Sequence, residues 1–461
     1  MKFSIPTLIT VLSSIIAVDA TCEFSGGNYY CSESKKVVYK GIGFAGSYQD
    51  VTYMDETTGS CHQQSYSFSG NLSPLDEELS VHFRGPLKLL QFGVYYPSGD
   101  KHKRNNRRDE ENCSVQHVHH KHKRATEIVE VTQTVYVDSN GNLVTTETPV
   151  AESHPETSAA QEPVQVQEPV QEQAPPPPQG TTSVTALAGE GKAYRPISTL
   201  SAPTTTSSVE ATSTATADGA WSRDSYYTPG NTDNCVFLNY HGGSGSGVWS
   251  AAFGNSLSYA NSDNSGASSS PVALEEITIG SNKEFVIMSG QQCSGSSCGY
   301  YRPGSVAHHG FGGNAKIFIF EFEMPSDNSG SGFNVDMPAV WMLNAKIPRT
   351  LQYGDASCSC WATGCGELDL FEILTAGSNK MISHLHDGQG AAKQQTNIGG
   401  GGSQDYFARP VSGSFKAAVI FLGDEIHVVQ VDDSTVFGSS LDEATVNSWL
   451  QQPGSLATLG Y

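Results

Sequence analysis

The feature that most restricts the fold of this chain is the recurrence of short runs of β-branched and aromatic residues separated by Gly, Asn, Asp and Ser. Such runs predict strands, and the apolar period of 3.6 that predicts helices is nearly absent. The pattern therefore predicts an all-β sandwich or barrel. Strands are expected after residue 218 at 276–279, 284–288, 316–323, 339–343, 367–374, 381–386, 416–422 and 425–431, and one helix is expected at 441–451, where Asp442 and Glu443 stand at its start.

Changes in composition divide the chain into five segments. Residues 1–20 read as a signal peptide and 21–100 as a small β-rich module with strands at 36–40, 64–68, 79–83 and 89–96. Residues 101–124 are rich in Lys, Arg and His, and 125–217 form a linker rich in Pro, Thr and Ser that cannot bury enough apolar surface to fold. Residues 218–461 hold all five Trp and form the expected C-terminal β-sandwich domain.

The N-terminus predicts export from the cell. Lys2 precedes an apolar stretch from Ile5 to Val18, and the small residues ending at Ala20 suit a signal peptidase. Residues 455–461 lack the apolar tail that a GPI signal needs, so no membrane anchor is expected. The formal net charge of −21 argues against nucleic acid as a partner, because phosphate binding needs a basic surface. We expect a secreted, extracellular protein that is either soluble or associated with the cell wall.

The basic segment ends in the dibasic pair Lys123-Arg124. A solvated charged tail is the simplest interpretation of such a run. Two alternatives stay open, namely processing by a kexin-like protease at this pair and metal binding by the neighbouring histidines.

Ten cysteines fit an oxidising compartment. Four precede the linker and six follow it, so disulfides can close within each half, and Cys293–Cys298 is expected to close a small loop. The spacing of Cys358, Cys360 and Cys365 is not that of a standard zinc site, and we expect neither a metal nor a cofactor. Asn71 and Asn112 begin possible N-glycosylation sequons.

Three acids lie close together in the run Glu367-Leu-Asp-Leu-Phe-Glu372. Glu367 and Asp369 share one face of a strand, but Glu372 falls on the other face unless a β-bulge near Leu370-Phe371 adds one residue. Two carboxyl groups flanking one bond are what glycoside hydrolysis requires. The alternative is a solvated edge strand whose acids face water.

The same run resembles the Glu-x-Asp-x-x-Glu signature of glycoside hydrolase family sixteen, which includes laminarinases, lichenases and fungal wall transglycosylases. That resemblance implies a jelly-roll fold and a retaining mechanism. It implies Glu367 as nucleophile, Asp369 as its hydrogen-bonding partner and Glu372 as acid/base. It also implies that Trp341, Trp361, His384 and His386 line the sugar subsites. A departure from the family is Ala362, where Pro usually follows the tryptophan. Trp221 and Trp249 are expected in the core.

The order of segments is similar to that of the yeast target-of-SBF family of cell-wall proteins. This resemblance implies action on wall polysaccharide, most simply as an endo-β-1,3-glucanase. Two alternatives remain open: a glucan or chitin transglycosylase, and a structural wall protein that binds glucan without turnover.

Overall fold

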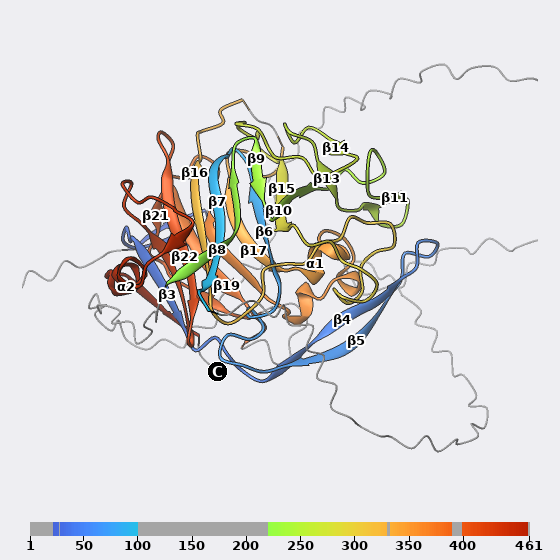
Figure 1. The fold of residues 1–461 in the computed structure, drawn as a ribbon, viewed down its shortest axis with the longest axis horizontal. Helices are drawn as coiled ribbons and strands as arrows, with labels where there is room; N and C mark the ends of the chain where they lie inside the picture. The colour runs from blue at the N-terminus through green and yellow to red at the C-terminus, as the bar shows by residue number, and fades with distance from the viewer. Residues whose placement is uncertain (1–21, 27, 100–219, 330–331, 390–398, 460–461) are drawn as a thin grey trace, which may run out of the picture. The chain divides into compact units, whose positions relative to one another are not determined.

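Two large β-sheets form the body of the protein (Figure 1). The computed structural model describes residues 22–26, 28–99, 220–329, 332–389 and 399–459. The first sheet runs, in order, β14 (Ala267–Ser268), β13 (Ser258–Ala260), β10 (Cys235–Asn239), β15 (Glu284–Ser289), β6 (Leu79–Arg84), β17 (Ala339–Asn344), β18 (Glu367–Glu372), β19 (Lys380–His386) and β20 (Gly401–Gly402), with β21 (Phe407–Ala408) also on β19.

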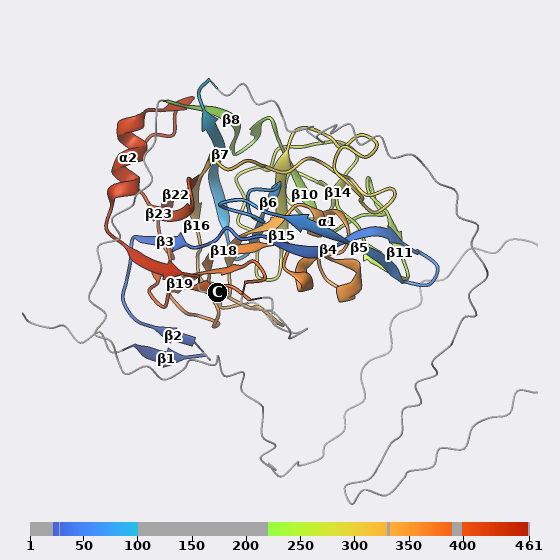
Figure 2. The same cartoon turned by 90° about the horizontal axis from the view of Figure 1, so that it is seen from below.

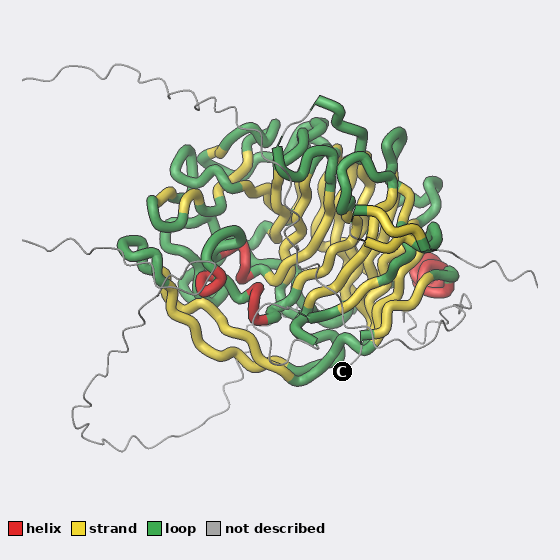
Figure 3. The backbone as a smooth tube through the Cα atoms, turned by 180° about the vertical axis from the view of Figure 1, so that it is seen from behind, coloured by secondary structure: helices red, strands yellow, loops and turns green. Residues whose placement is uncertain are grey.

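The second sheet runs, in order, β24 (Ser440–Leu441), β8 (Trp221–Thr228), β7 (Lys88–Pro97), β16 (Lys316–Glu323), β22 (Phe415–Leu422), β23 (Glu425–Gln430), β3 (Lys36–Lys40) and β25 (Ser455–Thr458), with β9 (Asn231–Asp233) on β8. Within the two sheets the described pairs of strands are antiparallel except β25 with β3. Figure 3 shows the strands side by side in the body of the fold, with one helix at its edge and a few short helical segments beside the strands.

The remaining elements are short. Three two-stranded ribbons pair β1 (Glu23–Ser25) with β2 (Asn28–Tyr30), β4 (Gly46–Met54) with β5 (Cys61–Phe68), and β11 (Trp249–Ser250) with β12 (Gly254–Asn255). The helices are α1 (Lys346–Arg349) and α2 (Glu443–Gln451), with the single 3₁₀ turns η1 (Ala356–Cys358) and η2 (Trp361–Thr363).

The core lies between the two sheets. Phe320 and Phe322 of β16 are fully buried, as are Phe83 of β6 and Phe371 of β18 in the opposite sheet. The ring centroids of Phe322 and Phe371 lie 5.5 Å apart, a contact that joins the sheets. Central strands such as β16 and β17 are buried along nearly their whole length, and the sandwich has its main core between the two sheets.

Most expected strands are confirmed, with bounds that move by one or two residues at most ends. The exception is 276–279, where the chain is irregular and Ile279 makes only an isolated bridge to Leu87. The helix expected at 441–451 is also confirmed as α2. Asp442 caps this helix, because its side chain accepts a hydrogen bond from the Thr445 amide at 2.7 Å. The expected signal peptide, basic segment and linker lie outside the described residues.

The expected boundary between a small module and a later catalytic domain needs correction. The β-rich character of residues before 100 is confirmed, but these strands belong to the two large sheets. Strand β6 pairs with β15 on one side and β17 on the other, and β7 pairs with β8 and β16. In Figure 1 these blue strands lie among green and orange ones. The two parts of the sequence share one core because neither could cover its apolar faces alone.

One disulfide also joins the early and the late part of the sequence. Cys61 in β5 is bonded to Cys358 in η1, which contradicts the expectation that bridges close within each half. The expected Cys293–Cys298 bridge is confirmed, and Cys22–Cys31 and Cys360–Cys365 are also formed. Cys235 is buried and not in a disulfide. Cys113 lies outside the described residues.

Helices of the described residues are too short and too polar to cross a membrane. The longest is α2, with nine residues.

A chain restricted to residues 218–461 should not fold, because it lacks β3, β6 and β7. We expect it to show no cooperative thermal transition by circular dichroism, whereas the full-length protein shows one. The matched control removes 100–219 and joins Gly99 to Ala220 through an Asn-Gly turn, since the Ser98 amide already lies 2.7 Å from the Ala220 carbonyl. A cooperative transition in the 218–461 fragment would contradict the shared core.

Candidate active site

The three acids of β18 lie on one face of the first sheet because the strand contains a bulge. On the neighbouring strand β17, Val340 pairs with Phe371 and Trp341 with Asp369, so Leu370 is the extra residue. Leu368, Leu370 and Phe371 are all fully buried in the core. Glu367, Asp369 and Glu372 are partly exposed on the opposite face, as the predicted bulge requires.

Trp361 fixes the first acid. Its indole Nε1 donates a hydrogen bond of 2.6 Å to Glu367 Oε2. Trp361 begins η2, a turn enclosed by the Cys360–Cys365 disulfide, and 39% of its side chain is exposed. An indole can only donate, so this contact orients the carboxylate form of Glu367 and leaves part of the ring free beside it.

His386 fixes the central acid. It lies opposite Glu367 on β19, and its Nε2 is 3.4 Å from Asp369 Oδ2. Burial opposes protonation of His386, but the contact with Asp369 and the charge of Glu367 outweigh it and raise the pKa of the imidazole to about 9. His384, opposite Asp369, has a lowered pKa because it is buried. One histidine of the pair therefore carries charge at neutral pH and the other does not.

Arg84 contacts the third acid and was missed by the sequence analysis. It ends β6, and its guanidinium donates to Glu372 Oε1 at 3.2 Å and to the Met337 carbonyl at 2.8 Å. The signal that could have found it is the alternation of Ser80, His82 and Arg84 with buried apolar residues, which gives β6 one polar face.

Trp341 is placed differently from an open sugar platform. It pairs with Asp369 in the site, yet only 5% of its side chain is exposed. Its ring stacks on His82 at a centroid distance of 5.2 Å, and Arg84 lies 5.8 Å from the ring centroid. Trp341 therefore packs beside the acids on the same sheet face and is covered there. Trp221 is buried as expected, whereas the expectation for Trp249 was wrong, since 60% of it is exposed.

The outer acids hold protons more tightly than ordinary glutamates. Burial and the charge of Asp369 raise the pKa of Glu367 to about 8, against the opposing effects of His386 and Trp361. Burial and Asp369 also raise the pKa of Glu372 to about 7, although Arg84 opposes the shift. Near neutral pH the cluster can therefore present a carboxylic acid beside a carboxylate, which acid-assisted displacement needs.

Glu367, Asp369 and His386 each offer one ligand atom, and these atoms lie within 4.8 Å of one another. This makes them the group of side chains in the site that could hold a cation. All three side chains already have partners, because Trp361 donates to Glu367, and His386 and Asp369 contact each other. The arrangement is that of a hydrogen-bonded acid cluster.

A hairpin from the N-terminal part of the chain borders the site. Tyr48 of β4 is buried in a cluster with Trp341, Leu343 and Cys365, and Lys346 pairs with Asp50 of the hairpin at 2.6 Å. Figures 1 and 2 show β4 and β5 passing below α1. The Cys61–Cys358 disulfide attaches the same hairpin to η1, three residues before Trp361. The position of Trp361 thus depends on residues far away in the sequence.

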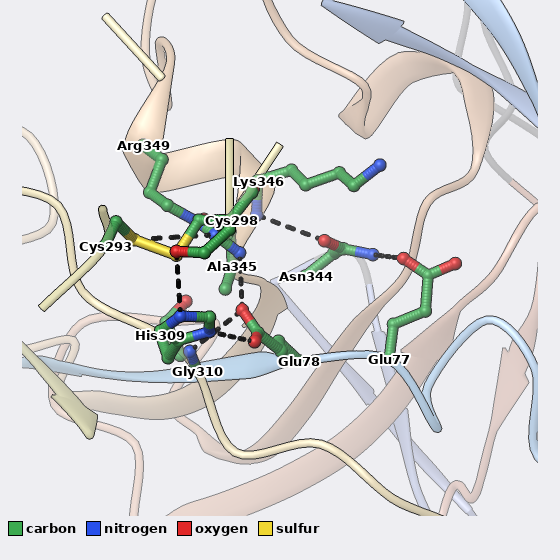
Figure 4. Close-up of polar contacts among 12 residues, drawn as sticks. Glu77, Glu78, Cys293, Cys298, His309, Gly310, Asn344, Ala345, Lys346 and Arg349 are labelled. Carbon is green, nitrogen blue, oxygen red and sulfur yellow. Dashed lines mark hydrogen bonds and ion pairs between the residues drawn. A yellow bond between two sulfur atoms is a disulfide. The ribbon is translucent and has the colours of Figure 1, made fainter. Parts of the chain in front are cut away.

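Two glutamates that precede β6 hold the hairpin and the segments around α1 in place (Figure 4). Glu78 accepts hydrogen bonds from Arg349 at 2.9 Å and from the Gly310 amide at 3.1 Å, and it contacts His309 Nδ1 at 2.5 Å. Glu77 accepts from Asn344 at 2.9 Å and from the Tyr48 hydroxyl at 2.8 Å. Burial raises the pKa of Glu77, whereas the pKa of Glu78 is lowered because its partners outweigh its burial.

Comparisons with known proteins identify relatives along the whole chain. A family model described as cell wall protein YJL171C/Tos1, C-terminal, matches residues 219–449, and the corresponding N-terminal model matches 35–97. A protein of Candida albicans called probable circularly permuted 1,3-beta-glucanase TOS1 is 70% identical over the full length of both chains. A protein of Saccharomyces cerevisiae with the same name is 49% identical over 99% of each chain.

A more distant relative keeps the same description. The protein of Arthroderma benhamiae called probable circularly permuted 1,3-beta-glucanase is 34% identical over 89% of this chain and 87% of its own. In the present chain β3 and β25 lie side by side, although in sequence order they are the first and last strands of the second sheet. No solved structure matches this chain.

Replacing Glu367 with Gln should stabilise the protein, and more so at higher pH. A folded-state pKa raised from 4.5 to about 8 favours folding below the unfolded pKa, and this contribution is lost as pH rises toward 8. Glu367→Gln escapes that loss, so its free energy of unfolding should exceed that of the wild type by about 1–2 kcal/mol at pH 8 and by little at pH 4.

Thermal or urea unfolding at both pH values measures this difference. Glu321→Gln is the control, because Glu321 lies in the other sheet and accepts a hydrogen bond from Ser414 at 2.8 Å. An equal stability gain for Glu367→Gln at pH 4 and pH 8 would show that ionisation of Glu367 is not the cause.

Proposed function

The chain belongs to the fungal YJL171C/Tos1 family of cell-wall proteins, and we propose that it hydrolyses β-1,3-glucan in the wall by a retaining mechanism. The observation that carries the proposal is the bulged strand β18, which gathers Glu367, Asp369 and Glu372 on one face. The names of the relatives support the choice of β-1,3-glucan.

In the first step Glu367 attacks the anomeric carbon and forms a glycosyl ester while Glu372 gives its proton to the departing glycosidic oxygen. In the second step Glu372, now a carboxylate, removes a proton from water. That water attacks the same carbon, and the bond to Glu367 breaks. Two displacements restore the original anomeric configuration.

The contacts of each acid suit its role. Burial and Asp369 raise the pKa of Glu367, and both Trp361, which donates to it, and the charge of His386 oppose that rise and favour the carboxylate that attacks. The raised pKa of Glu372 keeps a substantial fraction protonated near neutral pH, which a general acid requires. Arg84 then stabilises Glu372 after it has lost its proton.

A covalent intermediate can also be released by a sugar hydroxyl in place of water. Transglycosylation would therefore use the same three acids, and the products distinguish the two reactions.

We place this activity outside the plasma membrane. The N-terminal sequence 1–20 has the pattern of a signal peptide, and the four disulfides of the described residues suit an oxidising compartment.

Glu367→Gln and Glu372→Gln should each lower the rate of laminarin cleavage by about 10³-fold, because each removes a group that reacts. The assay uses the full-length protein, separates products by chromatography and follows the anomeric configuration of fresh products by NMR. Glu321→Gln is again the matched control and should keep wild-type activity.

Shortened chains with retained configuration support hydrolysis, and lengthened chains support transglycosylation. Products with inverted configuration would contradict Glu367 as nucleophile. A folded wild-type protein that binds laminarin without altering it would overturn the enzymatic proposal in favour of a wall-binding protein.

A further inference from the structure

A row of side chains crosses the first sheet from the acid cluster toward β15. Ala339 of β17 pairs with Glu372 on one side and with Arg84 of β6 on the other. Arg84 in turn pairs with Glu284 of β15. Directly opposite residues of neighbouring strands point to the same face of a sheet. Glu284 therefore lies on the face that carries the acids, three strands away from Glu372.

Three strand spacings separate these two carboxylates. Neighbouring strands lie ~4.8 Å apart, so Glu284 is displaced by roughly 14 Å across the sheet. One sugar ring is much shorter than this distance, and only an oligosaccharide could contact both ends of the row. Ala339 is the small member of the row, and the Arg84 guanidinium reaches past it to Glu372.

Tyr353 lies at the far end of the row, and Glu284 holds its hydroxyl in place. The hydroxyl donates to both carboxylate oxygens of Glu284, at 3.1 and 3.0 Å. Nevertheless, 60% of the side chain is exposed, so the ring itself faces solvent. Glu284 is partly buried, and this burial raises the pKa of its carboxyl group. The result is an aromatic surface with a fixed orientation and one open side.

Contacts with Tyr240 hold the loop around Tyr353 in place. The ring of Tyr240 lies edge-on to that of Tyr353 at a centroid distance of 6.4 Å, and the Tyr240 hydroxyl donates to the side chain of Gln352. Gly354 has φ +150°, and a side chain there would collide with Leu351. An exposed aromatic ring held in this way loses little conformational entropy when a ligand covers it.

We propose that Tyr353 is a stacking platform for a glucosyl unit remote from the bond that is cleaved. The inference rests on the proposed function and adds to it a preference for long chains. Apolar C–H faces of a glucosyl ring can pack on the exposed ring of Tyr353, and Arg84 and Glu284 between them offer charged groups to sugar hydroxyls. Short oligosaccharides bound at the acids cannot reach this platform.

The test compares Tyr353→Ala with Tyr353→Phe and with Tyr29→Ala, a tyrosine of similar exposure in β2. With long laminari-oligosaccharides we expect Tyr353→Ala to raise KM about 5- to 10-fold at unchanged kcat, since the variant removes one aromatic contact with the sugar. With short laminari-oligosaccharides the KM should not change. Tyr353→Phe keeps the ring and should show less than half of the effect, and Tyr29→Ala should show none.

Calorimetric titration of long oligosaccharides into the Glu367→Gln protein, with and without Tyr353→Ala, measures binding independently of turnover. A loss of affinity there, with no turnover by the wild type, would refute the proposed function and keep the platform. Equal losses for short and long ligands, an unchanged affinity, or a Tyr353→Phe effect as large as that of Tyr353→Ala would overturn the platform.

Discussion

The insertion of β6 between β15 and β17 is the pairing on which the rest of the structure depends. Its core face contributes Val81 and Phe83 to the interior between the sheets, and its other face carries Ser80, His82 and Arg84. Without β6 the first sheet would end at β17 on one side and at β15 on the other. The acid strand β18 is thus held in a continuous sheet by a segment that comes more than 280 residues earlier in the chain.

The acid cluster on this sheet face destabilises the folded protein unless other residues compensate for it. Three acids on one strand repel one another, and burial raises the pKa of both outer glutamates. Hydrogen-bond donors from three elements compensate for this repulsion: Trp361 from η2, His386 from β19 and Arg84 from β6. An apolar sheet face would be more stable, so the cluster indicates that this part of the fold is shaped by chemistry.

Local features of this fold were readable from the sequence, and long-range ones were not. Runs of β-branched and aromatic residues predict strands such as β16 and β22, and the spacing of three acids with an intervening apolar pair predicts the bulge at Leu370. The partners of β6 could not be predicted, because pairing across a long intervening segment leaves no periodic signal. For the same reason the Cys61–Cys358 bridge and the contact of Arg84 with Glu372 emerged only from the structure. Trp341 is buried partly by His82, which stacks beside it from the neighbouring strand β6, and spacing along one strand cannot reveal this contact.

Strands β7 and β8 are neighbours whose joining ends meet, with Pro97 opposite Trp221 and the Ser98 amide bonded to the Ala220 carbonyl. The chain on either side of segment 100–219 therefore ends and resumes at one point of the sandwich. A protease that cut anywhere in that segment, at Lys123-Arg124 for example, would yield two polypeptides without dividing the folded body. They would remain one particle, interleaved through β3, β6 and β7 and covalently joined by Cys61–Cys358, and would separate on a denaturing gel only after reduction.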